Sequence, residues 1–355
     1  MFSNISKYEY EEVLMNQLKK NNVSTNNIIR LDQNENYLVS TDDIKRLSHE
    51  VSNEYDLRRY SITETKALYE SMEKTLNVSS DSIVLGNGGD ELIDMVIRLF
   101  TKNGNILTFS PTYSIYRWSS DRSKTKIKEV SLNPDFNFNL DKFLDNITND
   151  VKLIILCSPN NPTGTQLQKN DILSICDQYD GPVLIDEVYS NFGDYSLVNE
   201  ITSYDNMILL HSLSKLGLAG IRIGYMLTNP KLANLLKGFV RPYNMNIHSL
   251  GIATKIMNEY DIINDGIQKA KKERKWVKTE LDNISNFKAF ESKANFHLIK
   301  LTNNVKTFYN QLLKQGIIIR DVSNLNLLEN CIRVAVGNRK MNERFLDVSR
   351  DILID

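Results

Sequence analysis

The chain has 355 residues, a length that allows a large core and predicts two domains. Its hydrophobic content of 41% and charged content of 25% are ordinary for a soluble protein. The formal net charge of -1 gives no reason to expect a nucleic-acid partner. It has no apolar run near the ~20 residues that a membrane span requires. Acidic residues, Glu9, Glu11 and Glu12, occupy the place where a signal peptide needs a hydrophobic core, so we expect neither membrane insertion nor secretion.

Cysteine and histidine usage gives a second set of exclusions. The three cysteines, Cys157, Cys176 and Cys331, are far apart and odd in number, which argues against a disulfide framework. The four histidines show no metal-ligand spacing with one another or with cysteine. We therefore expect a cytoplasmic protein without a metal site, a nucleic-acid partner or a membrane partner.

Hydrophobic periodicity predicts the elements in chain order. Residues 1–30 are polar, with one weak helical segment at 10–20, and we expect an arm over the body of the protein or over a partner subunit. Residues 31–37 are polar and are expected to be irregular. From about residue 40 to 245, apolar strands alternate with amphipathic helices. The predicted strands are 82–85, 106–109, 126–132, 151–157, 183–186, 207–211 and 221–227, and the predicted helices are 90–100, 112–120, 140–147, 167–178 and 230–238.

This alternation predicts an α/β fold, in which a mainly parallel sheet is flanked by helices. The pattern changes beyond residue 250 to long charged helices, followed by strands at 295–301, 317–320 and 332–336 and helices at 305–315 and the C-terminus. That part predicts a second, smaller α/β domain. The expected division is an N-terminal arm with part of the small domain (1–38), a large cofactor-binding domain (39–245) and a small C-terminal domain (246–355).

Ligands of open α/β sheets collect at the carboxyl ends of the strands, so the residues that follow each strand are informative. A glycine turn that contains Gly88 and Gly89 enters a helix at Asp90, where backbone N–H groups can bind a phosphate. This turn matches neither the G-x-G-x-x-G motif of dinucleotide-binding proteins nor the G-x-x-x-x-G-K-[ST] loop of nucleoside triphosphate-binding proteins. Tyr113 and a rigid turn with Asn161 follow two further strands.

The last two strand ends carry charged groups. Asp186 ends a buried strand, where a carboxylate is costly unless it is paired with a cation. The run from His211 to Tyr225 reads as strand, turn, strand, and it places Lys215 among small residues, a pattern typical of a tuned amine. Each of these residues alone is equally well explained as an ordinary turn, packed or surface residue.

One ligand accounts for all of these residues together. A phosphate suits the glycine turn, Ser212, Ser214 and Arg222, and an aromatic ring suits Tyr113. A ring nitrogen pairs with Asp186, and an aldehyde condenses with Lys215. These are the parts of pyridoxal phosphate.

The same residues carry a family resemblance that covers about residues 30–345. The motifs N-N-P-T-G, D-E-x-Y, S-x-S-K and R-x-G, in this order, resemble those of a fold-type I pyridoxal-phosphate aminotransferase. Within that group, N-E-N near residue 35, G-N-G-G-D-E, R-P-Y-N-M-N at 241–246 and C-I-R-V-A-V-G at 331–337 resemble the histidinol-phosphate aminotransferases.

The resemblance implies roles for individual residues. Lys215 binds the cofactor aldehyde and moves a proton between the substrate Cα and cofactor C4′, while Asp186 keeps the pyridine nitrogen protonated. Asn161 and Tyr189 bind the ring oxygen beside the aldehyde. The resemblance also implies that Tyr60 reaches the cofactor phosphate of the neighbouring subunit in a homodimer with shared sites. The catalytic set is then Lys215, Asp186 and Tyr189.

The implied substrates are small molecules: an amino acid or amino phosphate and a 2-oxo acid. By resemblance, Arg333 binds the substrate carboxylate through its bidentate fork. Arg320 is a candidate for the same anion pocket, and Asn36, Tyr37 and Tyr243 are expected nearby. Two departures lie near the substrate: N-E-N is followed by Tyr37 where the family usually has proline, and the R-Y-P segment continues with Ser61.

The expected activity is the interconversion of histidinol phosphate and 2-oxoglutarate with imidazole-acetol phosphate and L-glutamate, a step of histidine biosynthesis. A lyase like threonine-phosphate decarboxylase and an aminotransferase of another amino acid remain alternatives, because one fold supports many reactions. A non-catalytic protein that senses the cofactor is disfavoured by the intact set of site residues.

Overall fold

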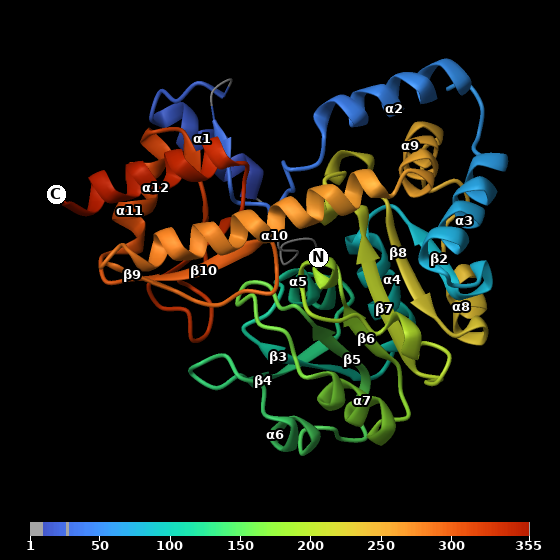
Figure 1. Ribbon diagram of the computed structural model, residues 1–355. Helices are drawn as coiled ribbons and strands as arrows, with labels where there is room; N and C mark the ends of the chain where they lie inside the picture. Colours follow the sequence, from blue (N-terminus) through green and yellow to red (C-terminus); the bar gives the residue numbers. More distant parts are fainter. Residues whose placement is uncertain (1–9, 26–27, 355) are drawn as a thin grey trace, which may run out of the picture.

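The computed structural model describes residues 10–25 and 28–354 (Figure 1). Its largest sheet has seven strands in the order β2-β8-β7-β6-β5-β3-β4. Neighbouring strands from β3 to β7 pair in parallel, and β8 is antiparallel to both β2 and β7, which confirms the predicted mainly parallel sheet. The strands are β2 (Ile83–Gly86), β3 (Asn105–Ser110), β4 (Lys126–Ser131), β5 (Val151–Cys157), β6 (Val183–Asp186), β7 (Met207–Ser212) and β8 (Gly224–Thr228).

Helices flank this sheet, and the middle of the sheet forms the core (Figure 1). Every residue of β6 and β7 is buried, as near-continuous apolar runs in a doubly covered parallel sheet require. The helices of this part are α2 (Thr41–Glu54), α3 (Thr63–Leu76), α4 (Gly89–Phe100), α5 (Ile115–Arg122), α6 (Leu140–Leu144), α7 (Lys169–Gln178), α8 (Pro230–Lys237) and α9 (Ile247–Asn258). The long helix α10 (Asp261–Asp282) runs from this core to the C-terminal sheet, and its buried residues belong to both apolar clusters (Figure 1). Short 3-10 turns lie at Ser80–Ser82, Ser190–Phe192, Val198–Glu200, Leu213–Leu216 and Ala219–Ile221.

Two predicted boundaries were wrong in ways that matter for the site. The helix expected from residue 112 begins at Ile115, because the Thr112 hydroxyl instead donates to Asn160 Oδ1 at 2.9 Å and holds the preceding segment as a loop. The strand expected from residue 221 begins at Gly224. Arg222 has a left-handed backbone with φ 54°, which interrupts extended structure just before the strand.

The C-terminal part contains a four-stranded antiparallel sheet in the order β12-β13-β10-β9. A separate parallel pair joins β1 to β11, so the strand predicted at 317–320 divides between two sheets. The predicted division of the chain at residues 38 and 245 stays a prediction. The elements here are β1 (Ile29–Arg30), β9 (Phe287–Ala289), β10 (Phe296–Leu301), β11 (Ile317–Ile318), β12 (Arg320–Asp321), β13 (Cys331–Ala335), α1 (Tyr10–Lys20), α11 (Val305–Lys314) and α12 (Arg339–Ile354).

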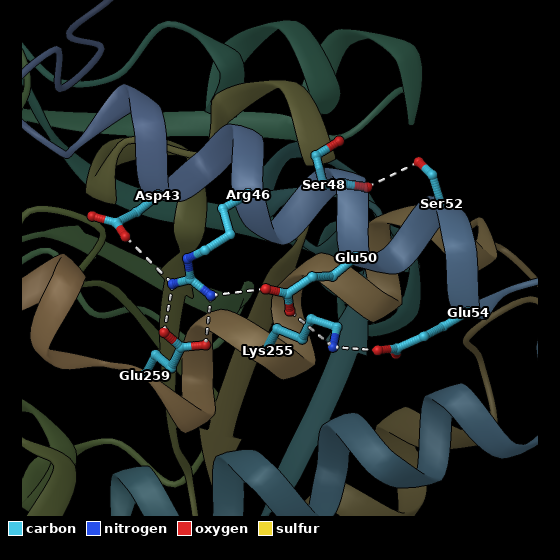
Figure 2. A network of polar contacts seen from close by, with 8 residues as sticks. All are labelled: Asp43, Arg46, Ser48, Glu50, Ser52, Glu54, Lys255 and Glu259. Atoms are coloured by element: carbon cyan, nitrogen blue, oxygen red, sulfur yellow. Dashed lines mark hydrogen bonds and ion pairs between the residues drawn. The ribbon is translucent and has the colours of Figure 1, made fainter.

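Helix α2 is joined to α9 by a network of ion pairs, shown in Figure 2. Arg46 Nη2 lies 2.6 Å from Glu259 Oε2, and Lys255 Nζ lies 2.7 Å from Glu54 Oε1. Most of these side chains are open to solvent, where such pairs contribute little to stability. The buried apolar side chains Leu47 and Val51 therefore hold α2 in place, and with it the following loop that carries Tyr60.

Within residues 10–25 and 28–354, no helix has the length and apolar character needed to cross a membrane.

Candidate functional site

The carboxyl ends of the parallel strands meet at a pocket, which we call the inner pocket. It brings together ten of the predicted site residues, although they come from five separate segments of the sequence: Gly89, Asp90, Tyr113, Asn161, Asp186, Tyr189, Ser212, Ser214, Lys215 and Arg222. Sequence reasoning missed four lining residues that have no polar motif to mark them as ligands: Ile93, Cys157, Val188 and Leu210.

One end of the inner pocket is the glycine turn before α4. Gly88 has φ +84°, and α4 begins at Gly89 without a side-chain cap on its first N–H groups. On β8, Gly224 allows the turn to lie close, since a Cβ there would be 2.6 Å from the carbonyl carbon of Gly88. Uncapped N–H groups at the start of a twelve-residue helix form an anion site.

Hydroxyl groups and a guanidinium surround the same end. Ser212 Oγ accepts a hydrogen bond from the Ser214 amide at 3.1 Å, and Arg222 Nη1 donates to Ser214 Oγ at 3.3 Å. Arg222 Nη2 lies 3.8 Å from Asp90 Oδ2. The left-handed backbone of Arg222 turns its side chain back toward the glycine turn, so that a Cβ on Gly88 would lie 2.5 Å from Arg222 Nη2.

Lys215 lies in the 3-10 turn after β7, in the middle of the site. Its Nζ donates a hydrogen bond to the Gln33 carbonyl at 2.9 Å. Burial, with a further contribution from the nearby charge of Arg333, lowers the pKa of Lys215 from 10.5 to about 8. A substantial fraction of this amine is therefore neutral near physiological pH, as a nucleophile or base requires.

Asp186, the last residue of β6, also lines the inner pocket. Tyr116 donates its hydroxyl to Asp186 Oδ2 at 2.6 Å, and the Val188 amide donates to Oδ1 at 3.2 Å. Burial raises the pKa of Asp186 to about 6 despite these two hydrogen bonds. The role of Tyr116 was missed, because on the sequence it is one more apolar residue on the buried face of a helix.

Three further predicted residues form one connected group beside Lys215. Tyr189 is buried, and its hydroxyl accepts a hydrogen bond from Asn34 Nδ2 at 2.9 Å. Asn161 Oδ1 accepts from Arg333 Nη1 at 2.5 Å, and Arg333 Nη2 donates to the carbonyl of Asp32. These contacts join the segment at 32–34 to the ends of the strands.

A second, more open pocket adjoins the first, and we call it the outer pocket. Both pockets share Tyr113, Asn161, Tyr189 and Lys215. Arg320 and Arg333 also line the outer pocket and are direct cross-strand neighbours on β12 and β13. Like charges placed opposite each other destabilise a sheet, and within the described part of the chain neither arginine forms an ion pair with a carboxylate. Two cations that face one pocket, neither of them paired with a carboxylate of the described residues, favour an anion there.

Five predicted residues do not line either pocket of the single chain: Gly88, in the turn beside the inner pocket, and Asn36, Tyr37, Tyr60 and Tyr243. Asn36 is buried and accepts a hydrogen bond from the Leu38 amide at 3.1 Å, and Tyr37 donates its hydroxyl to Glu35. Tyr60 and Tyr243 are exposed, and their ring centroids are 4.7 Å apart. Of the three residues in the N-E-N segment, the first asparagine, Asn34, lines the outer pocket.

The fold and site define an α/β enzyme with a reactive lysine, a buried carboxylate and anion-binding groups. Residues 26–348 match the family described as aminotransferase class I and II, and the chain belongs to this family. The predicted family is thereby confirmed.

Relatives and solved structures agree with this assignment. The chain is 35% identical over 311 residues to a histidinol-phosphate aminotransferase of Christiangramia forsetii, covering 86% of this chain and 88% of that protein. It is 32% identical over 332 residues to a histidinol-phosphate aminotransferase of Pyrococcus furiosus, covering 93% and 94% of the two chains. The crystal structure of the histidinol-phosphate aminotransferase from Clostridium acetobutylicum is 28% identical, has a TM-score of 0.83 and matches 91% of this chain and 98% of that one.

Proposed function

We propose that this aminotransferase interconverts histidinol phosphate and 2-oxoglutarate with imidazole-acetol phosphate and L-glutamate, using pyridoxal phosphate. The relatives named histidinol-phosphate aminotransferase support the reaction, since they match most of the chain at 32% to 35% identity. The observation that carries the substrate class is the cross-strand pair of Arg320 and Arg333 beside Lys215.

The donor set of the inner pocket fits pyridoxal phosphate. The α4 N–H groups, Ser212, Ser214 and Arg222 would hold its phosphate, and Asp186 would accept a hydrogen bond from its protonated ring nitrogen. Tyr113 would lie against the ring. When bound, this cofactor supplies an aldehyde that captures amino groups and a ring that takes up the electron pair released at the substrate Cα.

Asp186 and Lys215 would supply the charge and proton chemistry. The buried carboxylate of Asp186 is costly by itself, so a cationic ring nitrogen beside it forms a favourable pair and stays protonated. Lys215 Nζ, with its lowered pKa, can accept a proton from the substrate Cα and return it elsewhere. Tyr189 and Asn161 present polar groups to the same space.

Substrate recognition would rest on the outer pocket. Histidinol phosphate carries a phosphate, and L-glutamate carries carboxylates, so one pocket must bind both kinds of anion in the two half-reactions. Arg320 and Arg333 can serve both, because a guanidinium fork matches phosphate and carboxylate alike. An anion between them would also relieve their mutual repulsion.

The proposed enzyme is a homodimer in which Tyr60 of one subunit reaches the cofactor phosphate of the other. The support is a set of large apolar side chains that are each more than half exposed: Leu57, Tyr60, Ile62, Phe239 and Tyr243. Leu57, Tyr60 and Tyr243 line one surface hollow. Large exposed apolar patches of this kind mark interaction surfaces. Asn36 and Tyr37 keep their proposed substrate roles only if the second subunit completes the pocket around them.

We also place the enzyme in the cytoplasm. The three cysteines are buried and free, as expected for a reducing compartment.

A substrate screen of the purified, cofactor-loaded enzyme tests the proposed reaction. Histidinol phosphate, unphosphorylated histidinol, aromatic amino acids and threonine phosphate are each supplied with 2-oxoglutarate, and glutamate and carbon dioxide are measured. Glutamate formation fastest with histidinol phosphate is the expected result. If threonine phosphate releases carbon dioxide and no glutamate forms, the enzyme is a decarboxylase and the proposed aminotransferase reaction is wrong.

A further inference from the structure

The half-buried side chain of Arg320 is held by an aromatic ring. Its guanidinium carbon lies 3.7 Å from the ring centroid of Tyr10, and this is a cation–π contact at short range. Among the described residues it forms no ion pair with a carboxylate, although Asp321 is its neighbour in sequence. An aromatic face fixes the direction of a guanidinium without neutralising its charge, which stays available for an anion in the outer pocket.

Tyr10 is in turn held firmly from its other end. Its hydroxyl donates to Asp32 Oδ2 at 2.6 Å, and Arg30 donates to both carboxylate oxygens of Asp32 at 2.8 and 2.9 Å. The Asp32 side chain is fully enclosed. The carbonyl of the same residue accepts a hydrogen bond from Arg333, so one contact chain connects both arginines of the anion site through Tyr10 and Asp32.

The helix that carries Tyr10 is anchored away from the pocket. On α1, Leu14 and Leu18 are buried in an apolar cluster with Leu313 of α11 and Ile318 of β11, and Figure 1 shows α1 in the same region as α11. The ring of Tyr10 is therefore placed by packing that does not involve the substrate. This makes α1, outside the large sheet, a structural part of the outer pocket.

We propose that Tyr10 is a positioning residue for anion recognition, acting through Arg320. Its ring holds the guanidinium toward the outer pocket, against the repulsion of Arg333, in a direction that suits the phosphate of a substrate. The inference rests on the proposed function for the identity of that substrate. It predicts that α1 influences which substrates are bound and leaves the chemistry at Lys215 unchanged.

The test compares three variants of the cofactor-loaded enzyme. Tyr10→Leu removes the ring, Tyr10→Phe keeps the ring and removes the hydroxyl, and Tyr309→Phe is the matched control. Tyr309 also packs against α1, where its hydroxyl donates to Gln17 at 3.2 Å. The charge of Arg320 acts on it, but no hydrogen bond or cation–π contact joins it to either arginine within the described residues. KM and kcat are measured with histidinol phosphate and with histidinol, which lacks the phosphate.

For Tyr10→Leu, KM for histidinol phosphate is expected to rise about threefold to thirtyfold, the range of a cation–π contact, with kcat changed less than about twofold. Histidinol should be processed as by the wild type. Tyr10→Phe should show a smaller rise, and Tyr309→Phe none. Equal losses with both substrates, or the same loss in Tyr309→Phe, would mean that Tyr10 only stabilises α1 and would overturn the proposal.

A double-mutant cycle tests whether the effect passes through Arg320. In an Arg320→Met background, Tyr10→Leu should cause no further rise in KM, and additive effects would overturn the proposal. If the wild type does not accept histidinol phosphate, the proposed function fails, and inhibition of the L-glutamate half-reaction by inorganic phosphate becomes the readout. Weaker inhibition in Tyr10→Leu than in Tyr309→Phe then still supports the role of Tyr10, and equal inhibition refutes it.

Discussion

Replacing Asp186 with asparagine is expected to stabilise the cofactor-free chain and to abolish its catalysis. The carboxylate of Asp186 is buried at the end of β6, where it accepts hydrogen bonds from Tyr116 and from the Val188 amide. An asparagine of nearly the same shape can keep both contacts, with its Oδ1 facing Val188 and its Nδ2 donating to the Tyr116 hydroxyl. It cannot carry the negative charge that a protonated ring nitrogen needs.

The size of the gain follows from the pKa of Asp186, which burial raises from 3.8 to about 6. A raised carboxyl pKa means that the folded chain binds more protons than the unfolded chain between these two values, so its stability falls as the pH rises through that window. Integration gives a cost of about 3 kcal/mol at pH 8 and about half of that at pH 5. Because burying the amide has its own cost, we expect asparagine to recover about 1–3 kcal/mol at pH 8.

Urea unfolding of the cofactor-stripped wild type and Asp186→Asn at pH 5 and pH 8 measures this gain. Burial raises the pKa of Glu187 to about 7, and the charge of Asp186 adds to that rise. Asp186→Asn removes this contribution, so the change at Glu187 adds to the gain at pH 8 in the same direction. Asp121→Asn, which changes an exposed carboxylate on α5, is the control and should be neutral at both pH values. An Asp186→Asn chain that is no more stable at pH 8, or whose gain is the same at pH 5, would refute the reasoning.

Three other changes test single parts of the site. Lys215→Ala should still bind pyridoxal phosphate but lose about a thousandfold or more of transamination, measured in single turnovers, and steady residual turnover would contradict its role. In the cofactor-free chain, reductive trapping of an aldehyde on Lys215, followed by peptide mass spectrometry, should reach half its maximum near pH 8, and a midpoint near 10.5 would contradict the lowered pKa. Gly224→Ala should weaken cofactor binding about fivefold or more, because the added Cβ displaces the Gly88 turn. Gly220→Ala is the control and should not weaken binding, since nothing lies within 4 Å of its added Cβ. Equal Kd values for the two variants in a fluorescence titration would contradict this reasoning.

The parts of the fold that follow from local pattern could be predicted from the sequence. Strands β5 and β6 have the predicted bounds, because long apolar runs bounded by turn residues have few alternatives. The start of α5 and the interruption before β8 could not be predicted. They depend on a contact between Thr112 and Asn160 and on the left-handed backbone of Arg222, which are products of the tertiary structure.

The same distinction holds for the site. Residues that end strands, such as Lys215 and Asp186, could be placed together because parallel strands bring their carboxyl ends to one edge. Tyr10 and Tyr116 could not be found in this way, because each acts on another residue across the fold and neither belongs to a motif. The cross-strand pairing of Arg320 with Arg333 likewise depends on a register that only the folded sheet sets.

The most direct test of the proposed function is the colour of the cofactor-loaded enzyme during the two half-reactions. A single addition of histidinol phosphate should bleach the yellow colour of the lysine-bound cofactor, and 2-oxoglutarate added afterwards should restore it, with one L-glutamate formed per site. A yellow colour that persists after histidinol phosphate, but is bleached by another amino acid and restored by 2-oxoglutarate, would contradict the proposed substrate. No bleaching by any amino donor, including L-glutamate, would contradict the aminotransferase reaction itself.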